Sequence, residues 1–384
     1  MDRREYKRDN VLPSMPRAPL VSVVILNYNG RRFLRTCIES LRRQTLQDFE
    51  IIFVDNASSD GSAAFVESSY PDMLSTGKLL IIRNATNQGF AEGNNIGHRA
   101  AKGKYVLLLN NDTRASARLL ERLVETMASD PRIATAGGFV LDKGKERLYR
   151  RIIEKERRSL TITLCGDNVS APPSREERQL MERQSTPIRK QFYVSGAALM
   201  YRKNEHKRPF ERFYFLYAED TCLGWQSLIE GKRNVIRTDA IVYHYGSGTQ
   251  RTVRGISKVA VFHGTKNQLA NILLFYDWKT IVRILPLLMI VQIGHILENP
   301  RKIIVKPKAY WWVLSNMGLL LRKRREMQAR RSVPDKEILR GMSCAFYDAE
   351  ITDGKARRTT VRVMNGLFYA YCAIVRLKTC EFYR

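Results

Sequence analysis

Four short apolar runs between residues 20 and 110 constrain the fold more than any other feature of this chain. They are rich in Val, Ile and Leu and lie at residues 20–26, 49–54, 79–82 and 105–109. Amphipathic stretches lie between or after them, at residues 32–43, 60–69, 90–101 and 116–129. Short, nearly continuous apolar runs are typical of parallel strands that are covered by helices on both faces. The alternation therefore predicts an α/β fold, an αβα sandwich with a mostly parallel sheet.

The chain of 384 residues is longer than most single domains, so we expect two structural parts. Charge runs and a Pro pair indicate that residues 142–190 are an insertion or a mobile loop. We expect regular structure to resume at 192–201, to pass through 213–217 and a helix near 219–230, and to reach a strand at 235–243. Beyond residue 258 the pattern is helical. The expected division is an N-terminal tail (1–19), an α/β domain (20–255) that includes the insertion, and a helical region (256–384).

Basic residues are concentrated in the last part of the chain. Lys and Arg outnumber Asp and Glu by 65 to 38 overall, and residues 251–384 contain 25 basic and 9 acidic side chains. Such a field suits nucleic acid, anionic lipid or a polyanionic substrate, and net charge alone does not choose among them.

Apolar stretches at residues 281–297, 310–321 and 361–375 lie within this basic region. The first contains Arg283, Pro286, Gln292 and His295, and the second is shorter, so neither fits a bilayer-spanning helix of about 20 apolar residues. Basic runs flank them, as in helices that lie on a membrane surface. We therefore expect contact with an anionic membrane surface. The alternatives are a helical cap on the α/β domain or an interface with a partner protein.

The cysteines and the N-terminus indicate a cytosolic setting. Six cysteines are scattered without a CxxC pair or a zinc-finger spacing, which suits reduced thiols. Residues 1–10 are charged and lack the apolar core of a signal peptide. Together with the basic helical region, these features predict a cytoplasmic protein that is peripheral on the inner face of the cell membrane.

Polar side chains follow the first two predicted strands. Asn27 and Asn29 come after the first strand, and Asp55 comes directly after the second. Ligands of open α/β sheets collect outside the carboxyl ends of parallel strands, so these residues should meet at one edge. A carboxylate at Asp55 can accept the imide N–H of uracil or thymine, while backbone groups around Asn27 take the complementary base edge. Asp60, nearer the next helix, is assigned to helix capping.

A Gly- and Asn-rich segment at residues 87–97 contains Asn87, Gly89, Asn94 and Asn95. It has neither the GxGxxG spacing of a dinucleotide site nor the Lys of a Walker loop. Its glycines permit close backbone approach, and its amides can bind hydroxyls and phosphate.

The apolar run at residues 105–109 stops at Asn110, Asn111 and Asp112. These side chains can bind sugar hydroxyls, phosphate-bound water or a divalent cation. The alternative is that Asp112 or Thr113 caps the next helix.

Ionisable side chains also stand at the start of the helix predicted near residue 219 and at the end of the last predicted strand. Glu219 and Asp220 stand at the start of a predicted helix, where the helix N-terminus would keep a carboxylate ionised for use as a general base. The alternative is that both only favour the helix dipole. Trp225 is either a core residue or a platform on which a sugar stacks. His244 ends the last strand and could complete a metal site with Asp112 and diphosphate oxygens.

In this order, the blocks VSVVILNYNG, FVDNASSDGS, NQGFAEGNNIG, LLLNNDT, FLYAEDTCLGW and VYHYGSGT resemble the family 2 glycosyltransferases with the GT-A fold. The resemblance is to the rhamnosyltransferase- and galactofuranosyltransferase-like branch in particular and covers about residues 20–249. It implies a Rossmann-like GT-A domain, a UDP- or dTDP-linked sugar donor, inversion at the anomeric carbon, and a Mg²⁺ or Mn²⁺ ion. The tail looks like the basic helical extension of that branch, and it motivates a glycan or polyprenol-linked acceptor.

The resemblance also implies roles for individual residues. It suggests Asp220 as general base, Asp112 and His244 on the metal, and Asp55 at the nucleotide base. The remaining donor-binding candidates are Asn27, Asn29, Asn87, Gly89, Asn94, Asn95, Asn110, Asn111, Glu219 and Trp225. This chain departs from the acidic triplet of the family, because positions 110 and 111 are both Asn.

Two other functions compete with glycosyl transfer. The high pI fits a nucleic-acid-binding protein, but the basic runs border apolar helices and no RNP, zinc-finger or helix-turn-helix pattern accompanies them, so we expect no nucleic-acid partner. The Asn-rich triplet would also suit an inactive glycosyltransferase-like scaffold.

Overall fold

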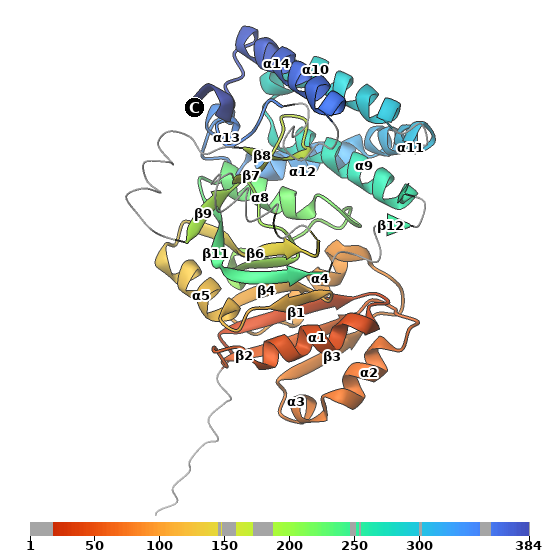
Figure 1. Ribbon diagram of the computed structural model, residues 1–384, viewed down its shortest axis with the longest axis vertical. Coiled ribbons are helices and arrows are strands. Elements are labelled where there is room, and N and C mark those ends of the chain that lie inside the picture. The colour runs from red at the N-terminus through yellow and green to blue at the C-terminus, as the bar shows by residue number, and fades with distance from the viewer. Residues whose placement is uncertain are drawn as a thin grey trace, which may run out of the picture.

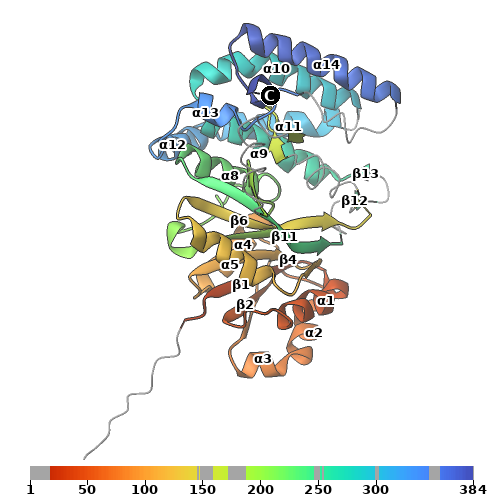
Figure 2. The same cartoon turned by 60° about the vertical axis from the view of Figure 1, so that its left-hand side comes forward.

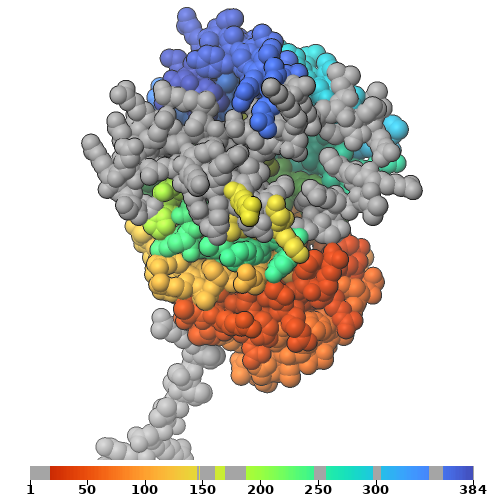
Figure 3. All heavy atoms as spheres, in the orientation of Figure 1, coloured from red at the N-terminus to blue at the C-terminus, as the bar shows by residue number. Residues whose placement is uncertain are grey.

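The computed structural model describes residues 18–144, 147, 159–171, 187–245, 251–252, 255–298, 302–345 and 355–383. A sheet and its N-terminal helices form one end of the molecule, and the helices that follow residue 257 form the other (Figure 1). Figure 3 shows the same division in space-filling form, with the N-terminal and C-terminal segments at opposite ends. The predicted N-terminal tail and most of the predicted insertion lie outside the described residues.

The first half of the chain alternates strands and helices as predicted. The strands are β1 (Val21–Asn27), β2 (Phe49–Asp55), β3 (Leu79–Arg83) and β4 (Tyr105–Asn110). The helices are α1 (Arg31–Arg42), α2 (Ser62–Ser69), α3 (Pro71–Ser75), α4 (Gly89–Ala100) and α5 (Leu119–Ser129). The largest difference from prediction is at α5, which was expected from residue 116 and begins at Leu119.

The first four strands are parallel, in the order β3-β2-β1-β4. Their register places Asn27 beside Asp55 and Leu26 beside Asn110. The polar residues that end β1, β2 and β4 therefore lie at the same edge of the sheet, as expected from the sequence.

The second half of the sheet is mixed. It contains β5 (Thr113–Ala115), β6 (Ile133–Asp142), β9 (Ile188–Gln191), β10 (Ala198–Arg202) and β11 (Arg233–His244), while β7 (Ser159–Ile162) and β8 (Asn168–Ala171) form a separate hairpin. β10 runs antiparallel between β4 and β6, and β11 is parallel to β6 but antiparallel to β5 and β9. Among the described strands of this sheet, parallel pairing occurs in the first four strands and in the β6–β11 pair.

Two stretches for which regular structure was expected differ in detail. Within residues 192–201 only the part from Ala198 onward is a strand, and residues 213–217 are turns and bends that lead into α8 (Glu219–Ile229). The short helix η2 (Lys203–Glu205) follows β10.

The C-terminal region is helical, as predicted. After the short pair β12 (Arg251–Thr252) and β13 (Gly255–Ile256), its helices are α9 (Lys258–Phe275), α10 (Trp278–Glu298), α11 (Lys302–Ser315), α12 (Met317–Gln328), α13 (Asp335–Leu339), α14 (Lys355–Ile374) and η3 (Cys380–Tyr383). Ser257 caps α9, because its Oγ accepts the N–H of Ala260 at 3.0 Å.

One hydrophobic core joins the helical region to the sheet. It includes Trp225 of α8, Phe275 at the end of α9, Val291 of α10 and Phe368 of α14, together with residues of β1 and β4. The α8–α9 side of the helical region therefore packs directly on the α/β part as a cap.

α10 is the one helix among the described residues that is long and apolar enough to cross a membrane, judged by length and composition. The stretch from Trp278 to Ile296 meets this criterion, with a third of it buried. The sequence had predicted that the run at residues 281–297 does not fit a bilayer-spanning helix, because it contains Arg283, Pro286, Gln292 and His295. Its buried side contains Gln292 and His295, which contact other helices.

Candidate active site

The loops after β1 and β2 are joined by side-chain hydrogen bonds. Nδ2 of buried Asn27 lies 3.3 Å from Oδ1 of Asp55 and 3.0 Å from Oγ of Ser58. The other carboxylate oxygen of Asp55 accepts the N–H of Ser58 at 3.2 Å. Asn29, whose φ of 52° is left-handed, accepts the N–H of Ser59 at 2.8 Å. These bonds fix the Asp55 carboxylate at the sheet edge.

Asn56 is a central residue of this edge that the sequence analysis missed. Its Nδ2 donates to Oδ1 of Asn87 at 2.8 Å and to the carbonyl oxygen of Gly89 at 3.1 Å. Its Oδ1 accepts from Nδ2 of Asn84 and from the N–H of Gln88. Buried Asn56 thus connects β2 to the start of α4, and its place directly after Asp55 was the available signal.

Asn110, Asn111 and Asp112 do not cap a helix. Thr113 begins β5, and α5 starts only at Leu119, so the capping alternative is wrong. Instead, Nδ2 of Asn111 donates to Oδ1 of Asn27 at 2.5 Å, and Oδ1 of buried Asp112 lies 3.2 Å from Nε2 of His244. The triplet therefore contacts both the β1 loop and the end of β11.

His244 is held between two carboxylates. Its Nδ1 lies 2.7 Å from Oδ1 of Asp142, which is its register neighbour at the end of β6. Burial alone would lower the pKa of His244, but the hydrogen bonds to Asp112 and Asp142 outweigh it and raise the pKa to about 9. The sequence analysis missed Asp142, because it placed that residue at the start of the insertion and not at a strand end.

Glu219 and Asp220 begin α8 after two residues with left-handed backbone, Tyr217 (φ 69°) and Ala218 (φ 61°). Asp220 accepts the N–H of Gly196 at 3.1 Å and of Thr221 at 2.7 Å. Burial raises the pKa of both carboxyl groups, that of Glu219 to about 8 with a further contribution from neighbouring Asp220. The expectation that the helix N-terminus keeps Asp220 readily ionised is wrong in direction, because desolvation outweighs the favourable N–H contacts.

Known proteins resemble this chain in sequence and in fold. Residues 22–206 match the sequence model of glycosyl transferase family 2. The match runs from β1 through η2, which is the α/β part of the chain up to the short helix after β10. The chain is 31% identical over 131 residues to the uncharacterized glycosyltransferase EpsJ of Bacillus subtilis, which is 34% of this chain and 37% of EpsJ. It is 33% identical over 114 residues to an uncharacterized glycosyltransferase of Haemophilus influenzae, which is 30% of this chain and 36% of that protein. The match thus spans a little more than a third of each of these relatives.

A solved structure shows the same fold. The crystal structure of GalNAc-T7 with UDP, GalNAc and Mn²⁺ superposes with a TM-score of 0.56 at 14% sequence identity, covering 70% of this chain and 51% of that one. The sheet-containing part of this chain therefore has a mixed α/β, GT-A-like fold, as the sequence predicted.

The residues present at the sheet edge fit a divalent cation. Asp112 offers a carboxylate oxygen and His244 an imidazole nitrogen, and these two atoms are already 3.2 Å apart. Among the described residues, no group of three or more His, Cys, Asp and Glu side chains is arranged to hold a metal. Protein ligands would therefore be few, which suits Mg²⁺ or Mn²⁺ because such ions share their coordination with phosphate and water. A cation there would displace the proton that His244 shares with Asp112.

The side chains of α4 serve packing more than ligand binding. Asn94 donates to the carbonyl oxygen of Phe90 and Asn95 to that of Phe210, both at 2.9 Å, and both side chains are buried. A Cβ on Gly89 (φ 76°) would lie 2.4 Å from the carbonyl oxygen of Phe215. The predicted donor-binding role of Asn94 and Asn95 is thus contradicted, because both side chains are buried and donate to the protein's own carbonyl oxygens. Asn87 stays near the edge through its bond to Asn56.

α9 holds the segment that precedes the Glu219–Asp220 pair. Asn267 donates to the carbonyl oxygens of Leu216 at 2.9 Å and Tyr217 at 2.7 Å, and Asn271 donates to that of Ala218 at 3.1 Å. Lys266 donates to the carbonyl of Phe213, and burial lowers its pKa to about 8. The sequence analysis missed these residues, although two Asn residues four positions apart on a largely apolar helix were a usable signal.

Trp225 is a core residue and not a platform for a sugar. It is 0% exposed and packs against Phe192, Phe275 and Tyr276, with ring centroids 4.9–5.5 Å away. The predicted donor-binding role of Trp225 is therefore contradicted by its burial.

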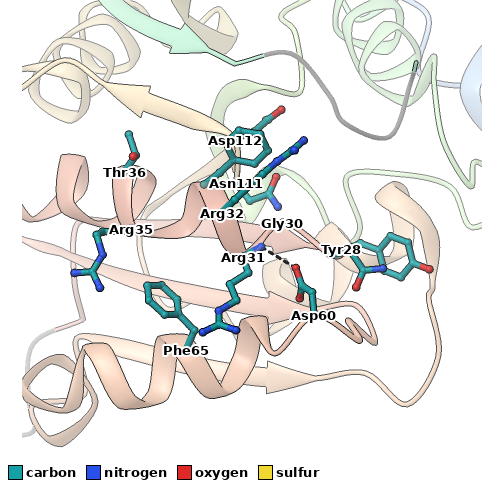
Figure 4. A pocket seen from close by; sticks show the side chains of 12 residues that line it. Tyr28, Gly30, Arg31, Arg32, Arg35, Thr36, Asp60, Phe65, Asn111 and Asp112 are labelled. Carbon is teal, nitrogen blue, oxygen red and sulfur yellow. Dashed lines mark hydrogen bonds between the residues drawn. The ribbon is translucent and has the colours of Figure 1, made fainter. Parts of the chain in front are cut away.

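A cavity of about 820 Å³ opens beside the sheet edge, on the α1 side (Figure 4). Its lining includes three predicted site residues, Asn29, Asn111 and Asp112, and it adds Arg31 and Arg32, which the sequence analysis missed. Figure 4 shows Arg32 beside Asn111 and Asp112.

Asp60 and Gly30 hold the starts of α1 and α2 in place beside this cavity. Asp60 accepts the N–H of Arg31 at 2.9 Å and of Ser62 at 3.1 Å, the first residues of α1 and α2. The N-cap position of α2 itself is Gly61, so Asp60 satisfies that helix start from one position before the cap. A Cβ on Gly30 would lie 2.0 Å from Nδ2 of Asn111, so only glycine leaves room for the Asn27–Asn111 bond.

Proposed function

We propose that this protein is an inverting, metal-dependent glycosyltransferase that moves a sugar from a UDP- or dTDP-linked donor to a hydroxyl of a glycan or polyprenol-linked acceptor. The observation that carries the proposal is the pairing of Asp112 with His244, 3.2 Å apart, at the strand edge that also holds Asp55. Neither residue is near the other in sequence, and the fold joins them where α/β proteins bind ligands. The names of the relatives and the UDP, GalNAc and Mn²⁺ of the GalNAc-T7 crystal support the same assignment.

In this proposal the donor lies along the strand edge. The Asp55 carboxylate, fixed by Asn27 and Ser58, accepts the imide N–H of the base. Asn29, Asn87, Asn110 and Asn111 offer amide groups to hydroxyls and phosphate. Asp112 and His244 would hold Mg²⁺ or Mn²⁺, which supplies Lewis-acid stabilisation of the charge that develops on the diphosphate.

Asp220 is the proposed general base. It takes the proton of the acceptor hydroxyl as that oxygen attacks the anomeric carbon, and the bond to the diphosphate breaks on the opposite face, which inverts the configuration. The raised pKa suits this role, because a base with a pKa closer to the working pH accepts the proton more readily. The neighbouring Glu219 is buried, and its Oε2 has no hydrogen-bond partner among the described residues.

We further propose a cytoplasmic enzyme that is peripheral on the inner face of the membrane. The helical region offers exposed apolar side chains on α10, α11 and α14 beside basic ones, and a membrane-bound acceptor would then be presented from that surface.

The proposal is tested by thermal unfolding with UDP-, dTDP- and GDP-sugars, with and without Mn²⁺. A ligand that binds only the folded state raises the apparent stability, so we expect one nucleotide class to shift the transition, and to shift it more with Mn²⁺. D112N should remove the Mn²⁺-dependent part of the shift. No shift with any nucleotide sugar would refute donor binding.

The role of Asp220 is tested by D220N in a transfer assay. The carboxamide keeps the shape but accepts no proton, and we expect transfer to fall by about 10²–10⁴-fold while the donor-induced thermal shift stays. Transfer at the wild-type rate would remove Asp220 from this role.

A further inference from the structure

A second cavity, of about 770 Å³, lies at the start of α10, among residues of α10, α13 and the C-terminal end of the chain. Five basic side chains line it: Lys279, Arg283, Lys336, Arg376 and Lys378. None of them forms an ion pair within 4.0 Å with a described residue. The only carboxylates in the lining, Asp277 and Asp335, face Arg331, with Asp335 at 3.0 Å.

This concentration of unpaired positive charge favours an anion. The first backbone N–H groups of α10 also lie here, and the N-terminus of a long helix adds positive potential. The lining contains two aromatic side chains, Trp278 and Tyr383. Trp278 is 53% exposed, and exposed Trp is typical of the level of lipid headgroups.

The side of α10 that continues away from this cavity is apolar and exposed. Val282, Leu285, Met289 and Ile293 recur at spacings of three and four and form one stripe, and their exposed fractions range from 48% to 69%. The opposite side of the helix, with Leu287 and Val291, is buried in the core.

α14 packs beside α10 and also carries exposed apolar side chains. Tyr371 of α14 donates to the carbonyl oxygen of Arg283 at 2.8 Å, so the two helices pack side by side, as Figure 2 also shows. Val363, Leu367 and Ile374 of α14 are exposed. An apolar surface on two neighbouring helices, next to a basic cavity, has the composition of a surface that lies in a membrane interface.

α10 lies on a membrane in this arrangement and does not cross it. Its buried side carries Gln292, whose Oε1 accepts Nζ of Lys306 at 2.6 Å, and His295, which lies 3.3 Å from the same Nζ. A helix surrounded by lipid would leave these groups without partners, and that is costly.

We infer that the basic cavity binds the phosphate headgroup of an anionic membrane lipid while the exposed stripe of α10 and α14 enters the acyl layer. The inference rests on the proposed membrane association and adds a specific headgroup site to it. Two adjoining features favour a lipid as the ligand. The positive charge of the cavity complements a phosphate, and the apolar surface beside it complements the acyl chains attached to that phosphate.

The test is sedimentation of the full-length protein with vesicles of phosphatidylcholine, alone or mixed with an equal amount of phosphatidylglycerol. The variant K279Q/K336Q/K378Q removes three cavity charges. The variant K308Q/R322Q/R325Q is its control, because it removes three exposed charges of the same helical region outside the cavity. Each basic residue near an anionic surface contributes about 1 kcal/mol, so the cavity variant should bind the anionic vesicles about 100-fold more weakly. The control should lose less than about tenfold.

Each other outcome overturns the inference in a distinguishable way. Equal losses in the two variants would indicate diffuse attraction and no headgroup site. Binding that is independent of phosphatidylglycerol would reject the anionic lipid. Release of the protein by micromolar glycerol phosphate would also reject the lipid and would assign the cavity to a soluble phosphate compound. A wild-type protein that ignores all vesicles and is a dimer by light scattering would assign the apolar surface to a second copy of this chain. Donor-induced thermal shifts, measured on the same samples, report separately on the glycosyltransferase proposal and on folding.

Discussion

Asn267 provides a direct test of whether α9 positions the proposed general base. Its side-chain amide donates to the carbonyl oxygens of Leu216 and Tyr217, just before Asp220, where Tyr217 and Ala218 have left-handed backbone. A left-handed residue other than glycine costs about 1–2 kcal/mol, so this segment keeps its shape only while surrounding bonds hold it. N267A removes two of those bonds.

The expected magnitude follows from the bonds that are lost. Each buried hydrogen bond contributes about 0.5–1.5 kcal/mol, so the loss of two amounts to about 2 kcal/mol. If that free energy appears as misplacement of Asp220, kcat should fall by roughly 30-fold, while KM for the donor stays the same. Initial-rate transfer assays at varied donor concentration measure both constants.

Gln328 offers a matched control for the same measurement. Its amide donates to two consecutive carbonyl oxygens, those of Leu274 and Phe275, at 2.8 and 2.9 Å, but these lie at the end of α9 and not in the segment before Asp220. Q328A should lower the unfolding temperature about as much as N267A and leave kcat within about threefold of wild type. Equal effects of the two substitutions on kcat, or an unchanged kcat in N267A, would refute the positioning role of α9.

Two further substitutions test the site through stability and donor affinity. The folded-state pKa of Glu219 is raised to about 8, above the unfolded value of about 4.3, so the folded protein binds more protons between these pH values and loses stability as pH rises through them. E219Q should therefore stabilise the protein more at pH 8 than at pH 5. A difference in unfolding temperature that does not depend on pH would contradict the argument that burial raises this pKa. G30A places a Cβ 2.0 Å from Nδ2 of Asn111 and should raise KM for the donor about tenfold, whereas G318A, whose Cβ meets nothing within 4 Å, should leave KM unchanged.

The alternation of strands and helices was readable from the sequence because hydrophobic periodicity is a local property. Parallel strands of one sheet present their carboxyl ends at one edge, so the meeting of Asn27, Asp55 and Asn110 also followed from order alone. The pairing of Asp112 with His244 could be anticipated for the same reason, since each follows or ends a strand.

The predictions that failed concern burial, which is not local. Trp225, Asn94 and Asn95 carry side chains that suit ligands as well as cores, and only the packing of α8 and α4 shows that they face inward. The prediction that Asp220 is readily ionised failed for a similar reason. The favourable effect of a helix N-terminus on a carboxylate is visible in the sequence, whereas the cost of desolvation depends on distant segments that pack around the residue.

The sequence by itself determined the α/β fold, the strand edge at which the polar residues collect and the helical, basic nature of the last third of the chain. Only the tertiary structure decided that Asp142 supports His244, that Asn56 joins β2 to α4, and that α9 holds the segment before Asp220. Periodicity and strand order arise from neighbouring residues, whereas these contacts join residues that are 31 to 102 positions apart and depend on how completed elements pack.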